Sequence, residues 1–403
     1  MRSKFLFPTL FLFASTWMLS CKKQSESPKT KVSIGALLSL TGNWSSLGLS
    51  SKAAIEQAVS DINLYLNARG SQYEFSSVIY DTKLDTTLAL KSIKEANGVG
   101  IKHFIGPQSS AELSSVRDYI NTNKLLVVSQ GSTASSLAVA NDGIFRFCPG
   151  DSIEGSAVAS SIRSQGFQNL ITLARDDAGN KGLQRAVGSK FSSLGGTTTA
   201  ITPYSTSQTN FAPLLATLKP LLQSAITSSG ASKVAVYLGS FDECVQIFQQ
   251  ASADPIFSSV QWFGGDGVVL SQALIGNAQA AAFAVNTKFF APNFGLPSQA
   301  HPDLAKVVAS IKSKSGVDPD AYAIAAYDAT WVIANSVINY QSNPSVFTDF
   351  LSIFKQESKH FYGLTGPLQL NEAGDRNNGS FDYWGIEFSN GTYKWKWVGV
   401  SGS

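Results

Sequence analysis

Apolar residues along most of the chain alternate between strand-like and helix-like spacing. Residues 32–40 form a continuous apolar run. In residues 50–66, apolar side chains recur at steps of four, three and four, which places them on one stripe of a helix. Strand and helix patterns then follow in strict alternation, which predicts a parallel sheet covered by helices on both faces. The next strands are expected at residues 74–80, 103–105 and 125–128, and helices at residues 86–96 and 113–120.

The same alternation restarts after residues 147–150, which indicates a second domain of the same kind. Long helices are expected at residues 302–315 and 320–339. The aromatic-rich tail, residues 381–400, alternates around Asn390-Gly391, which is typical of a hairpin. We therefore expect an α/β protein with two doubly wound parallel-sheet domains. In the second domain, strands are expected at residues 170–174, 198–203, 233–238 and 260–263, and helices at residues 154–164, 181–194, 211–227 and 243–253.

The beginning of the chain has the pattern of an export signal. Arg2 and Lys4 precede an apolar stretch of 13 residues, which is too short to span a bilayer, because a spanning helix needs about 20. We expect residues 1–20 to be a signal peptide. Ser20-Cys21 resembles a bacterial lipobox, in which the Cys is lipidated; the alternative is an unmodified thiol left by ordinary cleavage. Residues 21–31 are polar and would form a tether that holds the exported protein to a membrane through its lipid alone.

The composition and the absence of several sequence motifs reduce the number of functional classes to which the protein could belong. Of the 403 residues, 43% are hydrophobic and 15% are charged, as in a folded globular protein. The net charge of +3 comes without a dense basic stripe, so nothing indicates nucleic-acid binding. The three His and three Cys lie outside metal-site spacings, so we expect no metal and no cofactor. Nucleophile-elbow, Walker A and dinucleotide motifs do not occur, and no His lies in a strand-end loop of the predicted cleft, so we expect no enzymatic activity.

Polar residues gather in the loops that follow the expected strands. In open parallel sheets, ligands bind beyond the carboxyl ends of the strands. The first-domain loops are rich in hydroxyl, amide and glycine groups and precede helix N-termini, which suits a carboxylate. The second-domain loops carry Asp176-Asp177, Asp242 and Asp266 and suit a cation. Together the two lips would suit a zwitterion. The first-domain loops are residues 41–44, 106–110 and 129–133.

Each of these residues also has a purely structural interpretation. Serine and threonine at strand ends commonly cap helices and form turns. Asp177 and Asp242 could be helix N-caps, and Asp266, flanked by two glycines, could form a turn. Trp44 could belong to the core or to the rim of the cleft.

A series of short segments, in chain order from Val32 to Val398, resembles the type I periplasmic solute-binding proteins of the branched-chain amino acid ABC transporter class. The opening is the most specific part: residues 35–42, then Gly48 and residues 58–63. The later matches are Tyr80-Asp81 with Asp85, residues 104–107 with Ser109-Ser110, Val128-Ser129 with Ser132-Thr133, Phe145-Arg146, Cys148-Pro149 with Asp151, Asn210-Phe211, residues 263–267 and residues 365–376.

The resemblance implies two lobes that are joined by three crossings and close on a small solute in the cleft between them. Residues 32–148 with 290–366 would form the N-terminal lobe, and residues 149–289 with 367–400 the C-terminal lobe. The protein would be an extracytoplasmic lipoprotein, facing the periplasm or the cell exterior, that captures an amino acid or related solute for an ABC permease. A ligand-sensing receptor lipoprotein of the same fold, not coupled to transport, is the alternative.

The resemblance also assigns roles within the cleft. Ser110 and Thr133 lie where a hydroxyl binds the α-carboxylate, and Asp266 lies where an acidic residue meets the α-ammonium. Phe241 stands where Tyr is frequent, and Trp44 is near the position of another expected aromatic. A Cys pair of some members is absent, so no such disulfide is expected. The expected ligand contacts are Trp44, Ser109, Ser110, Gly131, Ser132, Thr133, Asp177, Phe241 and Asp266.

Overall fold

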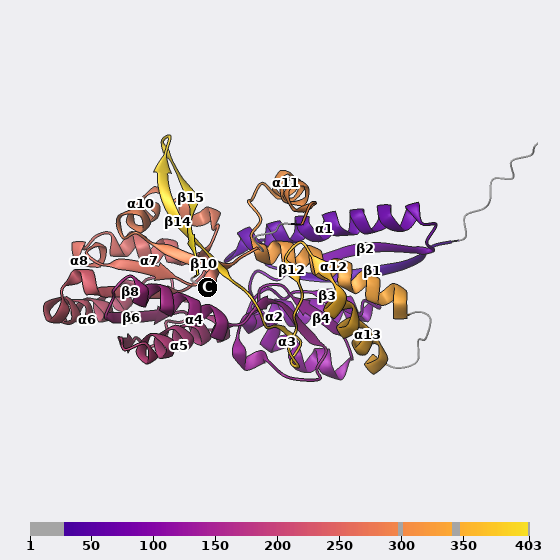
Figure 1. The fold of residues 1–403 in the computed structure, drawn as a ribbon, viewed down its shortest axis with the longest axis horizontal. Coiled ribbons are helices and arrows are strands. Elements are labelled where there is room, and N and C mark those ends of the chain that lie inside the picture. Colours follow the sequence, from indigo (N-terminus) through magenta and orange to yellow (C-terminus); the bar gives the residue numbers. More distant parts are fainter. Residues whose placement is uncertain (1–27, 297–300, 341–346, 402–403) are drawn as a thin grey trace, which may run out of the picture.

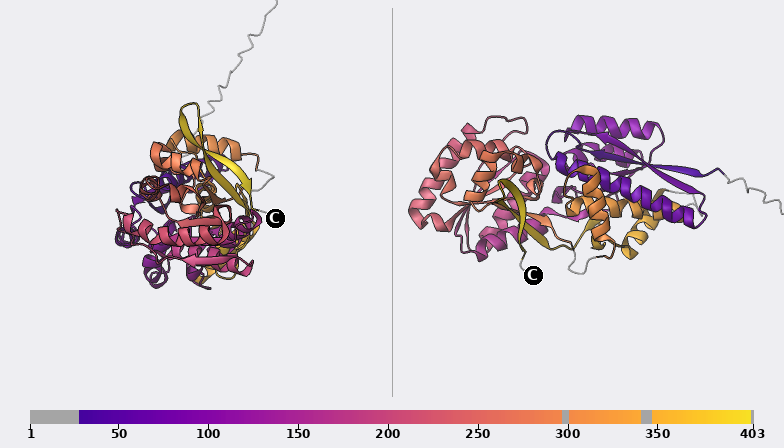
Figure 2. Two further views of the ribbon diagram at one scale, coloured as in Figure 1. Left: turned by 90° about the vertical axis from the view of Figure 1, so that its left-hand side faces the viewer. Right: turned by 90° about the horizontal axis from the view of Figure 1, so that it is seen from above.

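A computed structural model describes residues 28–296, 301–340 and 347–401. It consists of two lobes that lie side by side along the long axis (Figures 1 and 2). Each lobe is built on a mainly parallel sheet with helices on both faces, which confirms the predicted architecture. The predicted signal peptide, residues 1–20, and Cys21 lie outside the described residues.

The first lobe has a six-stranded sheet in the order β13-β5-β4-β3-β1-β2. Along β1, Ile34, Ala36 and Leu38 pack on the side of α1 and α12, whereas Leu37 packs on the side of α2 and α3. This alternation arises because successive strand side chains point to opposite faces. The strands are β1 (Thr30–Leu38), β2 (Tyr73–Asp81), β3 (His103–Ile105), β4 (Leu126–Ser129), β5 (Ile144–Pro149) and β13 (Asp375–Arg376). The helices are α1 (Ser45–Ala68), α2 (Thr86–Gly98), α3 (Ser110–Thr122), α11 (Leu304–Ser315), α12 (Ala321–Tyr340) and α13 (Phe347–His360), and β11 (Tyr362–Gly363) pairs with β12 (Gly366–Pro367).

The second lobe has a seven-stranded sheet in the order β15-β14-β10-β9-β8-β6-β7. Its last two strands form the predicted hairpin, which runs antiparallel and projects from the lobe (Figure 1). The strands are β6 (Asn169–Ala174), β7 (Thr197–Ala200), β8 (Val234–Gly239), β9 (Gln261–Gly264), β10 (Phe290–Phe294), β14 (Phe381–Ser389) and β15 (Thr392–Val400). The helices are α4 (Asp151–Ser164), α5 (Ala178–Ser193), α6 (Ala212–Ser229), α7 (Cys244–Ala251), α8 (Pro255–Ser258), α9 (Gln272–Gly276) and α10 (Ala278–Asn286).

Three segments connect the two sheets: one after β5, one after β10 and one between β13 and β14. The strand pairing differs from the expected lobe boundaries in two places. Residues 290–294 were expected in the first lobe, but β10 pairs with β9 and β14 of the second sheet. Residues 367–376 were expected in the second lobe, but β13 pairs with β5 of the first sheet. A strand of two residues is too short to show an alternating pattern, so no local pattern indicated β13.

The start of α1 brings the first strand-end loop close to the cleft. This helix begins at Ser45, five residues before the expected start, because Leu47 and Gly48 are also buried against the sheet. Gly48 lies so close to β1 that a side-chain carbon there would lie 1.8 Å from the carbonyl oxygen of Ser39. The preceding Trp44 has a left-handed backbone, with φ of 58°, and turns the chain into the helix.

Candidate ligand-binding site

A narrow cavity of about 10 Å³ lies between the lobes, at the carboxyl ends of the parallel strands. All of the expected ligand contacts except Ser109 and Ser132 line it. The lobes are therefore nearly in contact here, and a solute can enter only when they separate. The lining residues are Trp44, Ser110, Gly131, Thr133, Asp177, Gly179, Asn180, Leu183, Phe241 and Asp266.

Ser110 begins α3 and presents its hydroxyl at the first lip. Its oxygen accepts hydrogen bonds from the Ser132 hydroxyl at 3.0 Å and from the backbone N–H of Ala134 at 3.1 Å. Since both bonds are accepted, the hydroxyl hydrogen of Ser110 remains available to donate. The first N–H groups of a helix also lack partners within the helix. This lip therefore offers hydrogen-bond donors to an anionic group.

Ser109 and Ser132 lie beside this lip without lining it. Ser109 caps α3: its hydroxyl accepts from the N–H of Glu112 at 3.3 Å and donates to the Glu112 carboxylate at 2.5 Å. It borders a neighbouring cavity of about 170 Å³ that also contains Arg175. Ser132 is buried and supports Ser110. Ser109 is therefore a helix cap. Ser132 does not line the cavity but holds the hydroxyl of Ser110, which does.

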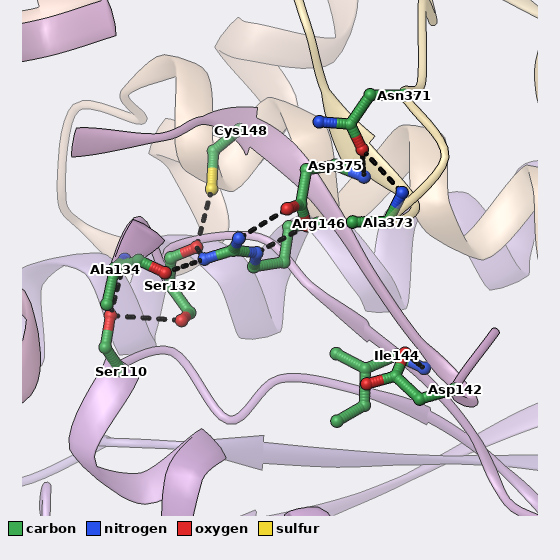
Figure 3. Close-up of polar contacts among 10 residues, drawn as sticks. All are labelled: Ser110, Ser132, Ala134, Asp142, Ile144, Arg146, Cys148, Asn371, Ala373 and Asp375. Carbon is green, nitrogen blue, oxygen red and sulfur yellow. Dashed lines mark hydrogen bonds and ion pairs between the residues drawn. The ribbon is translucent and has the colours of Figure 1, made fainter. Parts of the chain in front are cut away.

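Arg146 holds the loop of the first lip from behind (Figure 3). Its Nη1 donates to the carbonyls of Ala134 at 2.6 Å and Ser132 at 3.5 Å, and its other nitrogens form a bidentate pair with Asp375 at 2.6 and 2.5 Å. The Cys148 thiol donates to the same Ser132 carbonyl at 3.4 Å. Arg146 belongs to one of the segments that carry the resemblance, but no role was expected for it; a further signal is that it is a charged residue within an apolar segment.

Aromatic side chains from the two lobes meet at the mouth of the cleft. The rings of Trp44 and Phe241 stack with their centroids 4.7 Å apart. The backbone N–H of Trp44 donates to Asp242 at 2.8 Å, and the side-chain amide of Asn43 donates to Glu243 at 3.1 Å. Asp242 therefore accepts a bond from the opposite lobe, and Glu243, not Asp242, precedes α7. Trp44 is only 4% exposed and belongs to the core of the first lobe, and it also contacts Phe241 and Asp242 of the second lobe.

The second lip carries two carboxylates in different surroundings. Asp177 is the N-cap of α5, accepts two bonds from Asn180 at 2.9 Å, and lies 3.0 Å from the Arg175 guanidinium. Asp177 is therefore a helix N-cap, as its structural interpretation had it, and the Arg175 guanidinium compensates its negative charge. Asp266 accepts from the Tyr322 hydroxyl at 2.8 Å, and burial raises the pKa of its carboxyl to about 6. Asp266 is thus a lining carboxylate without a basic partner among the described residues.

The cleft and the two connected doubly wound lobes define the type I periplasmic binding protein fold. Three solved structures share it. The leucine-binding protein LivK of Thermotoga maritima is 21% identical, with 92% of this chain and 98% of that chain covered and a TM-score of 0.72. LivJ of Streptococcus pneumoniae, in complex with isoleucine, is 17% identical, with 92% and 100% covered and a TM-score of 0.72. A solute-binding protein of R. palustris, in complex with benzoate, is 14% identical, with 92% and 96% covered and a TM-score of 0.71.

The chain belongs to the family described as the receptor family ligand binding region, whose sequence profile matches residues 50–389. An uncharacterized protein of Methanocaldococcus jannaschii is 27% identical over 394 residues, which cover 94% of this chain and 91% of that protein. The structural relatives named above are binding proteins rather than enzymes. Within the part of the chain that the structure describes, no helix is both long and apolar enough to cross a membrane.

Proposed function

We propose that this protein is an exported solute-binding lipoprotein that captures an amino acid or a related small solute in the interlobe cleft and delivers it to an ABC permease. One observation carries the proposal: donors at Ser110 and the start of α3 face the Asp266 carboxylate across a single cleft. A carboxylate and an ammonium on one small molecule would satisfy both lips. Lipidation at Cys21 would keep the protein at the membrane that holds its permease.

The first experiment identifies the solute. The chain from residue 22 is purified without the lipid anchor, and its melting temperature is measured with each of the common amino acids and with benzoate. A ligand that binds only the folded state raises the melting temperature. A rise with at least one amino acid, followed by calorimetry of that amino acid, supports the proposal. If benzoate alone raises the melting temperature, the solute is not an amino acid.

Two variants then test the assigned lips. Asp266→Asn keeps the size of the side chain and removes its charge, and loss of one partner of a buried ion pair costs about 3–5 kcal/mol. At about 1.4 kcal/mol per decade, this is a loss of about two to four decades in affinity for the amino acid. Ser110→Ala should cost less, about 1.5–3 kcal/mol, because neighbouring N–H groups share the carboxylate. Equal affinities of the wild type and Asp266→Asn would contradict the assignment of the ammonium site.

A further inference from the structure

Two more carboxylates lie directly behind the second lip. Asp151 and Glu154 come from the first turn of α4 and are 1% and 0% exposed. The N–H of Asp151 donates to the carbonyl of Thr133 at 2.9 Å, and Glu154 Oε1 accepts from the N–H of Asp266 at 3.2 Å. Thr133 and Asp266 both line the cleft, so each of these carboxylates is one residue away from it. We call Asp151 and Glu154 the acidic cluster; Asp266 remains the lining carboxylate that is assigned to the α-ammonium.

Several polar atoms of this region have no partner. Among the described residues, Glu154 Oε2 accepts no hydrogen bond. The Asp151 carboxylate makes no bond of good geometry, although the Thr133 hydroxyl and the Ser135 N–H lie near enough to lower its pKa in part. The hydroxyl of Tyr237 in β8 is 0% exposed and also has no partner. It lies beside Gly265, where a side-chain carbon would come within 2.9 Å of it, and burial and then the three carboxylates raise its pKa. Buried polar groups are normally hydrogen-bonded, so these atoms point to a partner with several donors.

Within the part of the chain that the structure describes, no basic side chain forms an ion pair with the acidic cluster. Arg175 is used by Asp177 at 3.0 Å and Glu243 at 3.5 Å, and Arg146 is used by Asp375 at 2.5 Å. Among the described residues, no Lys or Arg lies within ion-pair distance of the acidic cluster. Burial raises the pKa of the Asp151 carboxyl to about 7, and the charge of Arg146, which is not in ion-pair contact with it, lowers that pKa only in part. Ion pairs among the described residues thus leave the acidic cluster open to a cationic group of the solute.

Only a thin wall separates the acidic cluster from the cleft. Asp151 lies against Gly182, where a side-chain carbon would be 2.0 Å from its Oδ2. The next residue, Leu183, lines the cleft, and its side chain also lies beside Gly265. The wall thus consists of Gly182, Leu183 and Gly265. Since the two glycines have no side chain, displacement of the Leu183 side chain would open a path from the cleft to the cluster.

We propose that the solute carries a second positive group, an ammonium or guanidinium on its side chain, and that the acidic cluster and the Tyr237 hydroxyl receive it. This inference rests on the proposed function and specifies its substrate class as cationic amino acids. Within the described residues, no group of His, Cys, Asp or Glu is arranged to hold a metal ion, so the occupant is an organic cation. Ammonium and guanidinium groups offer three and five donors, which suits the free oxygens of the cluster. The relatives' bound solutes, isoleucine and benzoate, lack such a group.

The test compares lysine with norleucine, which has the same carbon chain without the terminal ammonium. Calorimetry of the wild-type chain should give an affinity for L-lysine about 10- to 100-fold higher than for L-norleucine, the range expected for hydrogen bonds to charged groups. Glu154→Gln keeps an oxygen that can accept from the Asp266 N–H and removes the charge, so it should abolish most of the preference for lysine over norleucine. Asp176→Asn is the matched control: this carboxylate lies on the same lip, is half exposed, and already pairs with Lys181 at 2.6 Å.

The outcomes separate this inference from the proposed function. Norleucine binding as tightly as lysine to the wild type would overturn the cationic class and leave the proposed function standing. Binding of neither amino acid, together with no response to any other amino acid, would overturn both. The wild-type comparison does not depend on how well Glu154→Gln folds. If that variant folds and its lysine preference is unchanged, the acidic cluster is not the receiving site.

Discussion

Arg146 and Asp375 form a bidentate ion pair with side chains only 2% and 8% exposed, far from each other in the sequence. The pair connects β5 to β13, the last strand before the third crossing. Replacing Asp375 by Leu would leave the guanidinium buried without its counter-charge. We expect this single change to lower the stability of the first lobe strongly, because an uncompensated buried charge is much more costly than a lost surface ion pair.

The size of the expected loss of stability follows from the burial of the Arg146–Asp375 ion pair. Removing one partner of a buried ion pair costs about 3–5 kcal/mol. For a lobe of roughly 150–250 residues, 1 kcal/mol corresponds to about 2–4 °C in melting temperature, so Asp375→Leu should melt about 6–20 °C lower. Thermal unfolding followed by circular dichroism measures this shift. The double variant Arg146→Met with Asp375→Leu removes both charges and should recover a large part of the loss.

The control and a second readout separate this effect from a general loss of charge. Lys219→Ala breaks a surface ion pair with Asp254 at 2.7 Å, whose side chains are 46% and 31% exposed, and it should change the melting temperature little. Arg146→Met should also weaken solute binding, because the carbonyls of Ser132 and Ala134 lose their donor. A melting temperature of Asp375→Leu within about 2 °C of the wild type would refute the reasoning.

Three further predictions concern pH, motion and anchoring. Burial raises the pKa of Asp151 and of Asp320 to about 7. Between about pH 4 and pH 7 the folded protein therefore keeps protons on these carboxyls that the unfolded chain has released. The free energy of unfolding should be highest, as far as these two groups decide it, below about pH 4 and should decrease as the pH rises through about 7. The melting temperature should therefore fall between about pH 5 and pH 8, less steeply in Asp151→Asn, and a level profile in the wild type would contradict this. Solution scattering should give a smaller radius of gyration with a saturating solute than without it, because only a ligand that touches both lips shifts the equilibrium toward the closed form; an unchanged profile would count against closure. Labelled palmitate should enter the wild-type protein expressed in bacteria, and Cys21→Ser should release it from membranes; a Cys21→Ser protein that is still labelled and membrane-bound would exclude lipidation at this residue.

Much of the cleft could be predicted from the sequence because parallel strands place their following loops at one edge of the sheet. The loops that end in Ser110, Thr133 and Asp266 were found in this way, and the structure brings them together. The roles of Asp151 and Glu154 could not be predicted, since acidic residues in the first turn of a helix are usually explained by the helix dipole alone. Their burial against the opposite loops depends on tertiary contacts that no local pattern contains.

The strand order has a consequence for how the chain must fold. The first sheet contains both Thr30 and Arg376, and the second contains both Asn169 and Val400, so neither lobe is a continuous segment. A nascent chain that ends near residue 360 has formed neither the edge strand β13 nor the hairpin β14–β15. Long-range pairing of this kind slows folding, because loop closure precedes the contacts that reward it. The last 30 residues are therefore needed before either sheet has all of its strands, so neither lobe can be completed until synthesis has almost ended.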